Sequence, residues 1–390
     1  MSPTPFLKPD PDELPSSALV DNMYRVVRLI GRGGMGSVYE AEDTRLGRPV
    51  ALKVLRSDLA KQLQADERFI QEAKILARIR SPFVATVFNI GATEQGRTYI
   101  AMEYIDGESL GDLLDRERWL KLPRACRIAQ RVCEALMEAH KLGIIHRDLK
   151  PDNILLTRIG SVDDYVKVVD LGLAKHIAAQ GSEQNPRLTQ SRLVVGTPAY
   201  MSPEQAAGQE VGPQSDLYSL AVILYEMATG FLPVDGETPQ DYLRAHQLQA
   251  PVSVNVRRTD LVFPPQVDAF FRKVLAKSAA ERPRDARAFV QELEKLEGLL
   301  AESRSSRAAQ VAVQRPARRH DTALGPTIDM LAERIDRAKD RVRLELSGIC
   351  ARSRNMLGET IEGFVGDMQL RSDAPVVVLI RIQTPNDLLP

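Results

Sequence analysis

A string of polar residues set among apolar ones constrains this chain more than any other feature. Residues 146–153 read HRDLKPDN, an apolar Ile-Leu-Leu run follows, and residues 168–172 read VVDLG. Two short apolar strands bracketing these clusters would bring Asp148, Asn153 and Asp170 to one site. Phosphoryl transfer needs such a set, because an acidic group must lie near the attacking hydroxyl and oxygen ligands must hold Mg²⁺ against the phosphates.

A second signal is the glycine-rich run GRGGMGSV at residues 31–38. Alone, a G-x-G-x-x-G pattern could be a dinucleotide-binding turn or an empty flexible hairpin. A dinucleotide fingerprint opens a helix, whereas here the β-type segment SVYEAE follows. The context therefore favours a hairpin whose backbone amides close over phosphates, with the empty hairpin as the alternative.

Lys53 is a cation in the otherwise apolar strand PVALKVL. A lysine buried there needs an anionic partner or a ligand, because an unpaired buried charge costs several kcal/mol. Glu72 is the candidate partner, since its helical spacing places it on one face with Phe69, Leu76 and Ile79. The alternative is that Lys53 extends to solvent and Glu72 is an ordinary exposed helix residue.

The order of the expected elements suggests a small β-rich part followed by a larger helical part. Five β-type runs between residues 24 and 105, with a helical stretch at 64–80, predict a mostly antiparallel sheet carrying one helix. Beyond residue 107 long helical periodicity dominates, and Gly143 and Gly230 are typical of helix C-terminal ends.

The composition excludes several classes of protein. The 52 Lys and Arg residues cancel 52 Asp and Glu residues, which argues against a nucleic-acid or anionic-membrane partner. The apolar runs are too short for a membrane span, and no basic-then-apolar leader opens the chain. Three cysteines, Cys126, Cys133 and Cys350, show neither zinc nor disulfide spacing, so we expect a cytoplasmic location.

In their order and spacing, these motifs resemble the eukaryotic-like protein kinase superfamily, and specifically the bacterial Hanks-type serine/threonine protein kinases. The resemblance covers about residues 24–296. It implies an α+β, bilobal protein kinase fold: a small β-rich N-lobe with one helix, a larger α-rich C-lobe, and here a C-terminal helical extension. The boundaries that we expect are a flexible Pro-rich lead-in at 1–23, a kinase domain at 24–298 (N-lobe 24–105, C-lobe 106–298), a basic flexible linker at 299–325, and a helical region at 326–390.

The last region carries apolar residues spaced three and four apart from Ile328 to Ile349, and ends in the strand-like run PVVVLIRI. A coiled coil, and with it a homodimer, is one alternative. A docking helix, an autoinhibitory segment and simple packing within the chain are the others.

The resemblance implies an ATP site. Its glycines cover the phosphates, an apolar roof of Ile30, Val38 and Ala51 lies over adenine, Met102 is the gatekeeper, and Glu103 and Ile105 offer backbone groups. The expected ATP-binding residues are Ile30, Gly31, Arg32, Gly33, Gly34, Met35, Gly36, Ser37, Val38, Ala51, Lys53, Met102, Glu103 and Ile105.

The resemblance also implies catalytic roles. Lys53 would contact the α- and β-phosphates and pair with Glu72, Asp148 would accept or orient the substrate proton, and Lys150 would stabilise the transferring phosphate. Asn153 and Asp170 would bind Mg²⁺, with Mn²⁺ as an alternative. Lys150 and Thr197 follow the serine/threonine pattern, so the expected substrates are Ser and Thr hydroxyls on proteins.

Two motifs depart from the family pattern. Leu171 replaces the commoner Phe in the metal-binding triplet, where the middle residue packs in the core and binds no metal. Ser202 replaces Ala in the Ala-Pro-Glu triplet. By the resemblance, Glu204 pairs with Arg282 in a buried ion pair, and Asp216 anchors the backbone of the catalytic loop. The local sequence leaves open that Asp216 is a plain N-cap of the helix that it opens.

A switch is expected next to the catalytic aspartate. Arg147 would bind a phosphorylated activation loop, with Thr189 and Ser191 as the candidate phosphorylation sites. The alternative is a polar loop that is never modified. A non-catalytic ATP-binding scaffold is the rival function, but such proteins usually lose Lys53, Asp148 or Asp170. A small-molecule kinase is disfavoured by the intact segment at 196–204.

Overall fold

The computed structural model describes residues 13–33, 36–56, 76–171 and 197–313, with side chains described as far as residue 301. The chain divides into two units, residues 1–310 and residues 311–390, and nearly all described residues belong to the first. The expected helical region at 326–390 and most of the expected helix at 64–80 lie outside the described residues.

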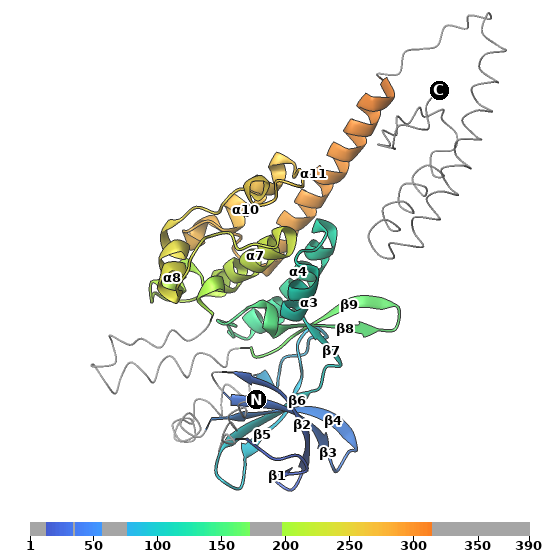
Figure 1. Cartoon of the computed structure of the whole chain (residues 1–390), viewed down its shortest axis with the longest axis vertical. Coiled ribbons are helices and arrows are strands. Elements are labelled where there is room, and N and C mark those ends of the chain that lie inside the picture. Colours follow the sequence, from blue (N-terminus) through green and yellow to red (C-terminus); the bar gives the residue numbers. More distant parts are fainter. Residues whose placement is uncertain (1–12, 34–35, 57–75, 172–196, 314–390) are drawn as a thin grey trace, which may run out of the picture. The chain divides into compact units, whose positions relative to one another are not determined.

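Six strands form an antiparallel sheet in the order β1-β2-β3-β4-β6-β5 (Figure 1). Alternate side chains point to one core, in which Tyr39, Leu52 and Tyr99 are fully buried. All five predicted strands are present within a few residues of their expected bounds. The strands are β1 (Leu19–Val20), β2 (Tyr24–Gly33), β3 (Gly36–Asp43), β4 (Arg48–Leu55), β5 (Val87–Ala92) and β6 (Thr98–Glu103).

The expected flexible lead-in at 1–23 is wrong for its last residues. Leu19 and Val20 pair with β2, and the Val20 side chain is buried in the sheet core. The backbone N of Ser17 donates to Val26 O at 2.8 Å. Backbone pairing and apolar burial therefore order this end of the segment, despite the prolines that precede it.

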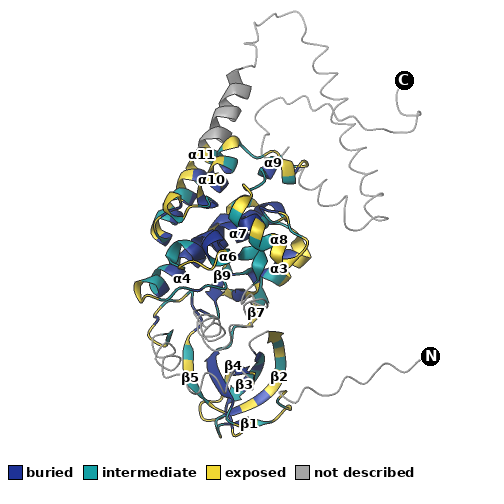
Figure 2. Cartoon of the chain, turned by 90° about the vertical axis from the view of Figure 1, so that its left-hand side faces the viewer, coloured by how far each residue is buried: buried dark blue, intermediate teal, exposed yellow. Residues whose placement is uncertain are grey.

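The second part is helical and is built around α4 (Leu122–Lys141) and α7 (Pro213–Thr229), which pack together. Figure 2 shows α7 buried over most of its length, as expected for a helix that is apolar almost all round. Gly230 ends α7 in a left-handed conformation with φ of 77°. The other helices are α3 (Leu110–Glu117), α6 (Pro203–Ala206), α8 (Pro239–Leu248), α9 (Val254–Arg257), α10 (Pro265–Val274) and α11 (Ala286–Val313), with 3₁₀ turns η1 (Pro151–Asn153), η3 (Pro198–Tyr200) and η4 (Ala279–Glu281).

A small antiparallel sheet, β7-β8-β9, carries the polar clusters singled out in the sequence. Ile154 pairs with Val168, so the strand after the first cluster lies beside the strand that leads into the second. The expected pair of apolar strands is therefore confirmed. The strands are β7 (Gly107–Ser109), β8 (Ile154–Ile159) and β9 (Val162–Val168).

The expected flexible linker at 299–325 is corrected at its start. The helix α11 continues to Val313, past residue 299. Ala is the commonest residue between 299 and 313 and is the strongest helix former, and neither Gly nor Pro interrupts this stretch, so a composition that suggested a linker accompanies an extended helix.

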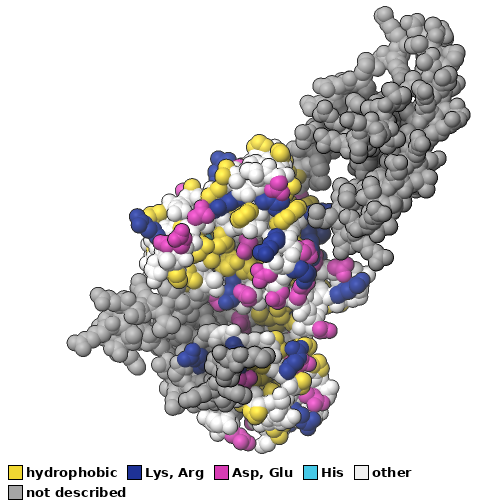
Figure 3. All heavy atoms as spheres, in the orientation of Figure 1, with side chains coloured by type: hydrophobic (Ala, Val, Ile, Leu, Met, Phe, Trp, Pro, Cys, Tyr) yellow, Lys and Arg dark blue, Asp and Glu magenta, His cyan; other side chains and the backbone are white. Residues whose placement is uncertain are grey.

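Cations and anions are interspersed on the face drawn in Figure 3, where blue and magenta side chains alternate over the described residues. Within those residues, no helix is long and apolar enough to cross a membrane.

Candidate active site

Asp216, in the first turn of α7, binds the backbone at the start of the loop at residues 146–153. Asp216 is 1% exposed; Oδ2 accepts from His146 N and Oδ1 from Arg147 N, both at 2.9 Å. His140 Nε2 lies 2.8 Å from Oδ2. The expectation that Asp216 anchors this loop is confirmed.

Three predicted residues contact Asp148, two through its carboxylate and one through its backbone carbonyl. Thr197 N donates to Oδ1 at 3.3 Å, and Lys150 Nζ lies 3.8 Å from Oδ2. The side chain of Asn153 donates through Nδ2 to Asp148 O at 2.7 Å. Residues from the loop and from the segment before α6 therefore surround one carboxylate.

Lys53 and Asp170, which are 117 residues apart, form an ion pair with a Nζ–Oδ2 distance of 2.6 Å. Lys53 is 5% exposed, so the charge that was expected to need a partner has one. Asp170 has φ of 60°, and the residue before it donates its N to Asn153 O at 3.0 Å. Glu72, the partner that was expected for Lys53, lies outside the described residues.

The glycine-rich run is a hairpin between β2 and β3, and strand register places several predicted ATP-binding residues side by side. Val38 pairs with Lys53, and Ala51 pairs with Met102. Gly36 lies so close to β4 that a Cβ there would be 2.2 Å from Val54 O, which explains why only glycine fits.

The remaining ATP-site predictions have these positions. Gly31 pairs with Val38, Arg32 with Ser37 and Gly33 with Gly36 across the hairpin. Ile30 is 46% exposed at the end of β2, and Ile105 follows β6. Gly34 and Met35 lie outside the described residues, as do Thr189 and Ser191.

Glu103 does more than the sequence indicated. Its carboxylate forms an ion pair with Lys167, with Nζ–Oε1 at 2.7 Å, and accepts from Thr86 N at 3.1 Å. Its backbone N donates to Thr86 O at 2.9 Å. This residue therefore ties the end of β6 to β9.

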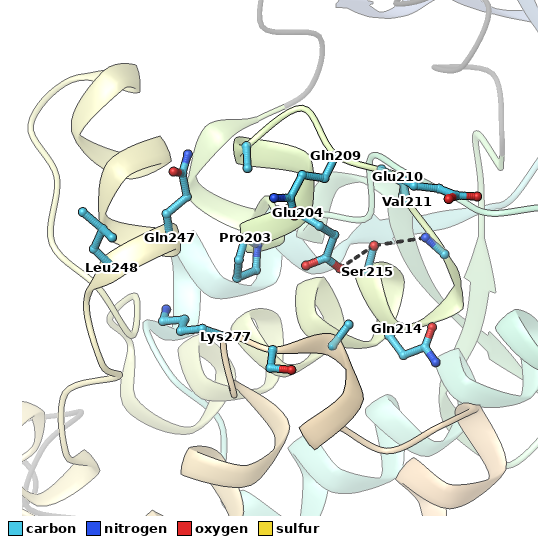
Figure 4. Close-up of a pocket in the computed structure, with 14 residues that line it drawn as sticks. Pro203, Glu204, Gln209, Glu210, Val211, Gln214, Ser215, Gln247, Leu248 and Lys277 are labelled. Atoms are coloured by element: carbon cyan, nitrogen blue, oxygen red, sulfur yellow. Dashed lines mark hydrogen bonds between the residues drawn. The ribbon is translucent and has the colours of Figure 1, made fainter.

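The expected buried ion pair between Glu204 and Arg282 is confirmed. The two guanidinium nitrogens Nη1 and Nη2 each donate to one carboxylate oxygen at 2.8 Å. Ser215 Oγ donates to Glu204 Oε1 at 2.6 Å (Figure 4). Burial alone would raise the pKa of Glu204, but these hydrogen bonds outweigh it and lower that pKa.

Figure 4 also shows a pocket beside this ion pair. It is lined by Pro203, Gln209, Gln247 and Lys277 among others, and none of the predicted ATP, metal or catalytic residues lines it. This pocket is therefore not the predicted ATP or catalytic site.

The model of the protein kinase domain family matches residues 24–294. The chain belongs to the protein kinase family. The match begins at the first residue of β2 and ends in α11, so it includes every residue of the site described above.

Two curated kinases illustrate the similarity. The chain is 40% identical over 286 residues to the serine/threonine-protein kinase pkn3 of Myxococcus xanthus, covering 73% of this chain and 52% of that protein. It is 38% identical over 266 residues to the serine/threonine-protein kinase PknB of Mycolicibacterium smegmatis, covering 67% of this chain and 41% of that protein. The chain therefore spans about half the length of these relatives or less.

A solved structure of the PknI kinase domain from Mycobacterium tuberculosis has the same fold. The TM-score is 0.57 at 29% identity, covering 73% of this chain and all of that one. The double mutant C20A_R136N of the same domain gives a TM-score of 0.55 at 28% identity. The expected protein kinase fold, with a β-sheet N-lobe and a helical C-lobe, is confirmed.

Three side chains that hold the kinase segment 197–200 were missed by sequence reasoning. His246 Nε2 bonds to Ala199 O at 2.8 Å, and Ser219 Oγ donates to Tyr200 O at 2.7 Å. Tyr200 Oη donates to Glu226 at 2.8 Å. Ser219 and Glu226 are polar residues inside an apolar helix, and His246 lies in a mostly polar one; both patterns are too common to identify a role.

Burial shifts the pKa values of two of these side chains, Glu226 and His246. It raises the pKa of Glu226 to about 7 and lowers the pKa of His246 to about 4. His246 is therefore neutral near pH 7. Because a carbonyl oxygen only accepts, its Nε2 donates to Ala199 O.

Proposed function

We propose that this chain transfers the γ-phosphoryl group of ATP to Ser and Thr hydroxyls of proteins. The observation that carries the proposal is the convergence on Asp148, whose carboxylate oxygens lie 3.3 Å from Thr197 N and 3.8 Å from Lys150 Nζ. Asp148 orients the acceptor hydroxyl and accepts its proton, and Lys150 stabilises the charge on the transferring group. Both curated relatives carry serine/threonine-kinase names.

The donor set fits a nucleotide-bound divalent cation. Asn153 Nδ2 donates to Asp148 O, which leaves Oδ1 as the acceptor of that amide. Asp170 accepts from Lys53 through Oδ2, so we assign the cation to Oδ1. In the described part of the chain, no three His, Cys, Asp or Glu side chains form a metal cluster.

Two protein oxygens suffice for such a site. In nucleotide complexes, Mg²⁺ takes one or two protein ligands and completes its shell with water and phosphate oxygens. We assign Mg²⁺, with Mn²⁺ able to replace it; ATP with its cation supplies the transferable group and partly neutralises its charge. Asn153 and Asp170 would hold that cation.

The β2–β3 hairpin and β4 would bind ATP. Gly31, Gly33 and Gly36 leave room for phosphates against the backbone, and Lys53 reaches the α- and β-phosphates from β4. Pairing of Ala51 with Met102 supports an apolar wall for adenine on adjacent strands. The other predicted hairpin residues, with Glu103 and Ile105, complete the assignment.

Regulation by phosphorylation is part of the proposal. Phosphate on Thr189 or Ser191 would add about two negative charges and draw in Arg147, beside Asp148. Glu72 would pair with Lys53 in the active state. Mass spectrometry of the active protein tests this, and full activity with both hydroxyls unmodified contradicts it.

The decisive experiment measures phosphate transfer from labelled ATP to a Ser- or Thr-containing protein, with Mg²⁺ present. Asp148→Asn should lower kcat by about 10²-fold or more, as for loss of a catalytic base. Asp163→Asn is the matched control, because Asp163 is 74% exposed and pairs only with Arg158 among the described residues. No transfer by the wild type, with ATP still bound, would favour a non-catalytic scaffold.

We also propose a cytoplasmic location, supported by the need for ATP and by the free, buried thiols of Cys126 and Cys133. A homodimer through residues 326–390 stays a prediction. Comparing the solution mass of the full chain with that of a chain lacking those residues tests it.

A further inference from the structure

The side chain of Gln205 has two separate tasks. It belongs to a capping box at the start of α6, where Gln205 N donates to Ser202 Oγ at 3.3 Å. Gln205 Oε1 accepts from Ser202 N and from Ser202 Oγ, both at 3.1 Å. Glu is as suitable as Gln for these contacts, because the cap uses only an acceptor oxygen.

The other end of the same amide reaches the catalytic loop. Gln205 Nε2 donates to Arg147 O at 2.7 Å. This second contact needs a donor, which a carboxylate lacks. The amide of Gln205 therefore donates a hydrogen bond to the catalytic loop, which the Glu that is common at this position of a capping box could not do.

The residue that Gln205 holds is strained. Arg147 has φ of 69°, a left-handed conformation that costs a non-glycine residue on the order of 1–2 kcal/mol. Its N donates to Asp216 Oδ1 and its O accepts from Gln205 Nε2. Such a conformation persists only where the surroundings fix it, and here side chains from α6 and α7 hold both of its backbone polar groups.

This strain bears directly on Asp148. The C=O of Arg147 lies in the planar peptide that leads to Asp148, so its direction sets the position of the next N and Cα. On the other side, Asn153 Nδ2 holds Asp148 O at 2.7 Å. The carbonyls of the two peptide groups that flank the Asp148 Cα are thus each bonded to an amide donor, one from Gln205 and one from Asn153.

We propose that Gln205 is a positioning residue for Asp148: its Nε2 donor fixes the Arg147–Asp148 peptide, while its Oε1 caps α6. The kinetic part of this inference rests on the proposed phosphoryl transfer. The structural part, which concerns the backbone of residues 146–149, does not.

The test compares two substitutions that separate the two tasks. Gln205→Glu keeps the acceptor for the cap but removes the donor, and Gln205→Met removes both. We expect both to lower kcat by about tenfold or more, on the scale of misplaced catalytic groups. Only Gln205→Met should also lower Tm by several degrees. The KM for ATP should stay within about twofold, because the proposed ATP-binding residues all lie between Ile30 and Ile105.

Gln214→Glu is the matched control. The Gln214 side chain also donates through Nε2 to a carbonyl, that of Arg284 at 3.2 Å, which belongs to the segment before α11 and not to the loop at 146–153. This variant should leave kcat unchanged.

Hydrogen exchange supplies a readout that needs no catalysis. In Gln205→Glu, amides at residues 146–149 should exchange faster than in the wild type, whereas those of α4 should not. Unchanged exchange there, or a kcat within twofold of the wild type, overturns the inference. A wild type that transfers no phosphate contradicts the proposed function alone, and the exchange comparison still decides the role of Gln205.

Discussion

Replacing Arg282 tests how the helical lobe is held together. Its guanidinium uses all five N–H donors: two to Glu204, and one each to the carbonyls of Ala276, Gln214 and Lys277, at 2.7 to 3.1 Å. Its side chain is fully buried, and that of Glu204 is 10% exposed. Lysine has three donors on one flexible point and cannot reproduce this pattern.

Arg282→Lys should therefore behave almost as a deletion. It leaves a buried carboxylate with imperfect pairing and frees buried carbonyls. Breaking a buried ion pair in this way costs about 3–5 kcal/mol. We expect Arg282→Met to lower the free energy of unfolding by that amount, and Arg282→Lys by more than half of it.

A double-mutant cycle that combines Arg282→Met with Glu204→Gln measures the coupling free energy between the two side chains. Because Glu204→Gln removes the charge that Arg282→Met strands, the double variant should lose about 2 kcal/mol less than the sum of the singles.

The assay is urea unfolding at neutral pH, followed by the fluorescence of Trp119, the only tryptophan in the chain. The Arg258 guanidinium lies 4.2 Å from its ring centroid, so its signal reports on the helical lobe. A loss below about 1 kcal/mol in Arg282→Lys, or additive losses in the double variant, would refute the argument.

Three further predictions follow from the described contacts. Since the pKa of Glu226 is raised from 4.5 to about 7, its carboxyl favours folding most below pH 4.5 and loses that contribution as pH rises through 7. The free energy of unfolding of Glu226→Gln, relative to that of the wild type, should therefore rise by up to about 3 kcal/mol between about pH 5 and pH 8 in urea unfolding. A difference between the two proteins that does not change with pH contradicts this. Gly230→Ala should lower the free energy of unfolding by about 1–3 kcal/mol, because φ is 77° and a Cβ would lie 2.7 Å from Arg118 O. An unchanged midpoint of urea unfolding would disprove this. Asp216→Ala should lower kcat about 10²-fold in initial-rate assays, since it frees the amides of His146 and Arg147; near-normal kcat in a folded variant argues against anchoring.

Much of the fold could be predicted from local patterns. Five strands of the large sheet and the helices α4 and α7 follow from periodicities of two and 3.6 residues. The predictions failed at two places where a segment was judged flexible from its composition. Val20 joins the sheet because its neighbours bury it, and α11 runs past residue 299 although its polar composition suggested a linker.

Some residues of the site could be recognised in the sequence and others could not. Asp148, Asn153 and Asp170 were recognisable because the motif places their polar side chains among apolar ones. Gln205, His246 and Glu226 were not, because nothing near them in the sequence shows that their partners lie 26 to 58 residues away.

The sequence by itself determined which residues are candidates for the chemistry, since the motifs depend on side-chain type and local spacing. It also determined that Glu204 and Arg282 would pair, through the resemblance of their motifs to a known family. Only the tertiary structure decided that Lys53 bonds Asp170 and that Gln205 holds Arg147 O. The physical reason is that hydrogen bonds and ion pairs act over about 3–4 Å in space, whereas sequence patterns report only neighbours along the chain.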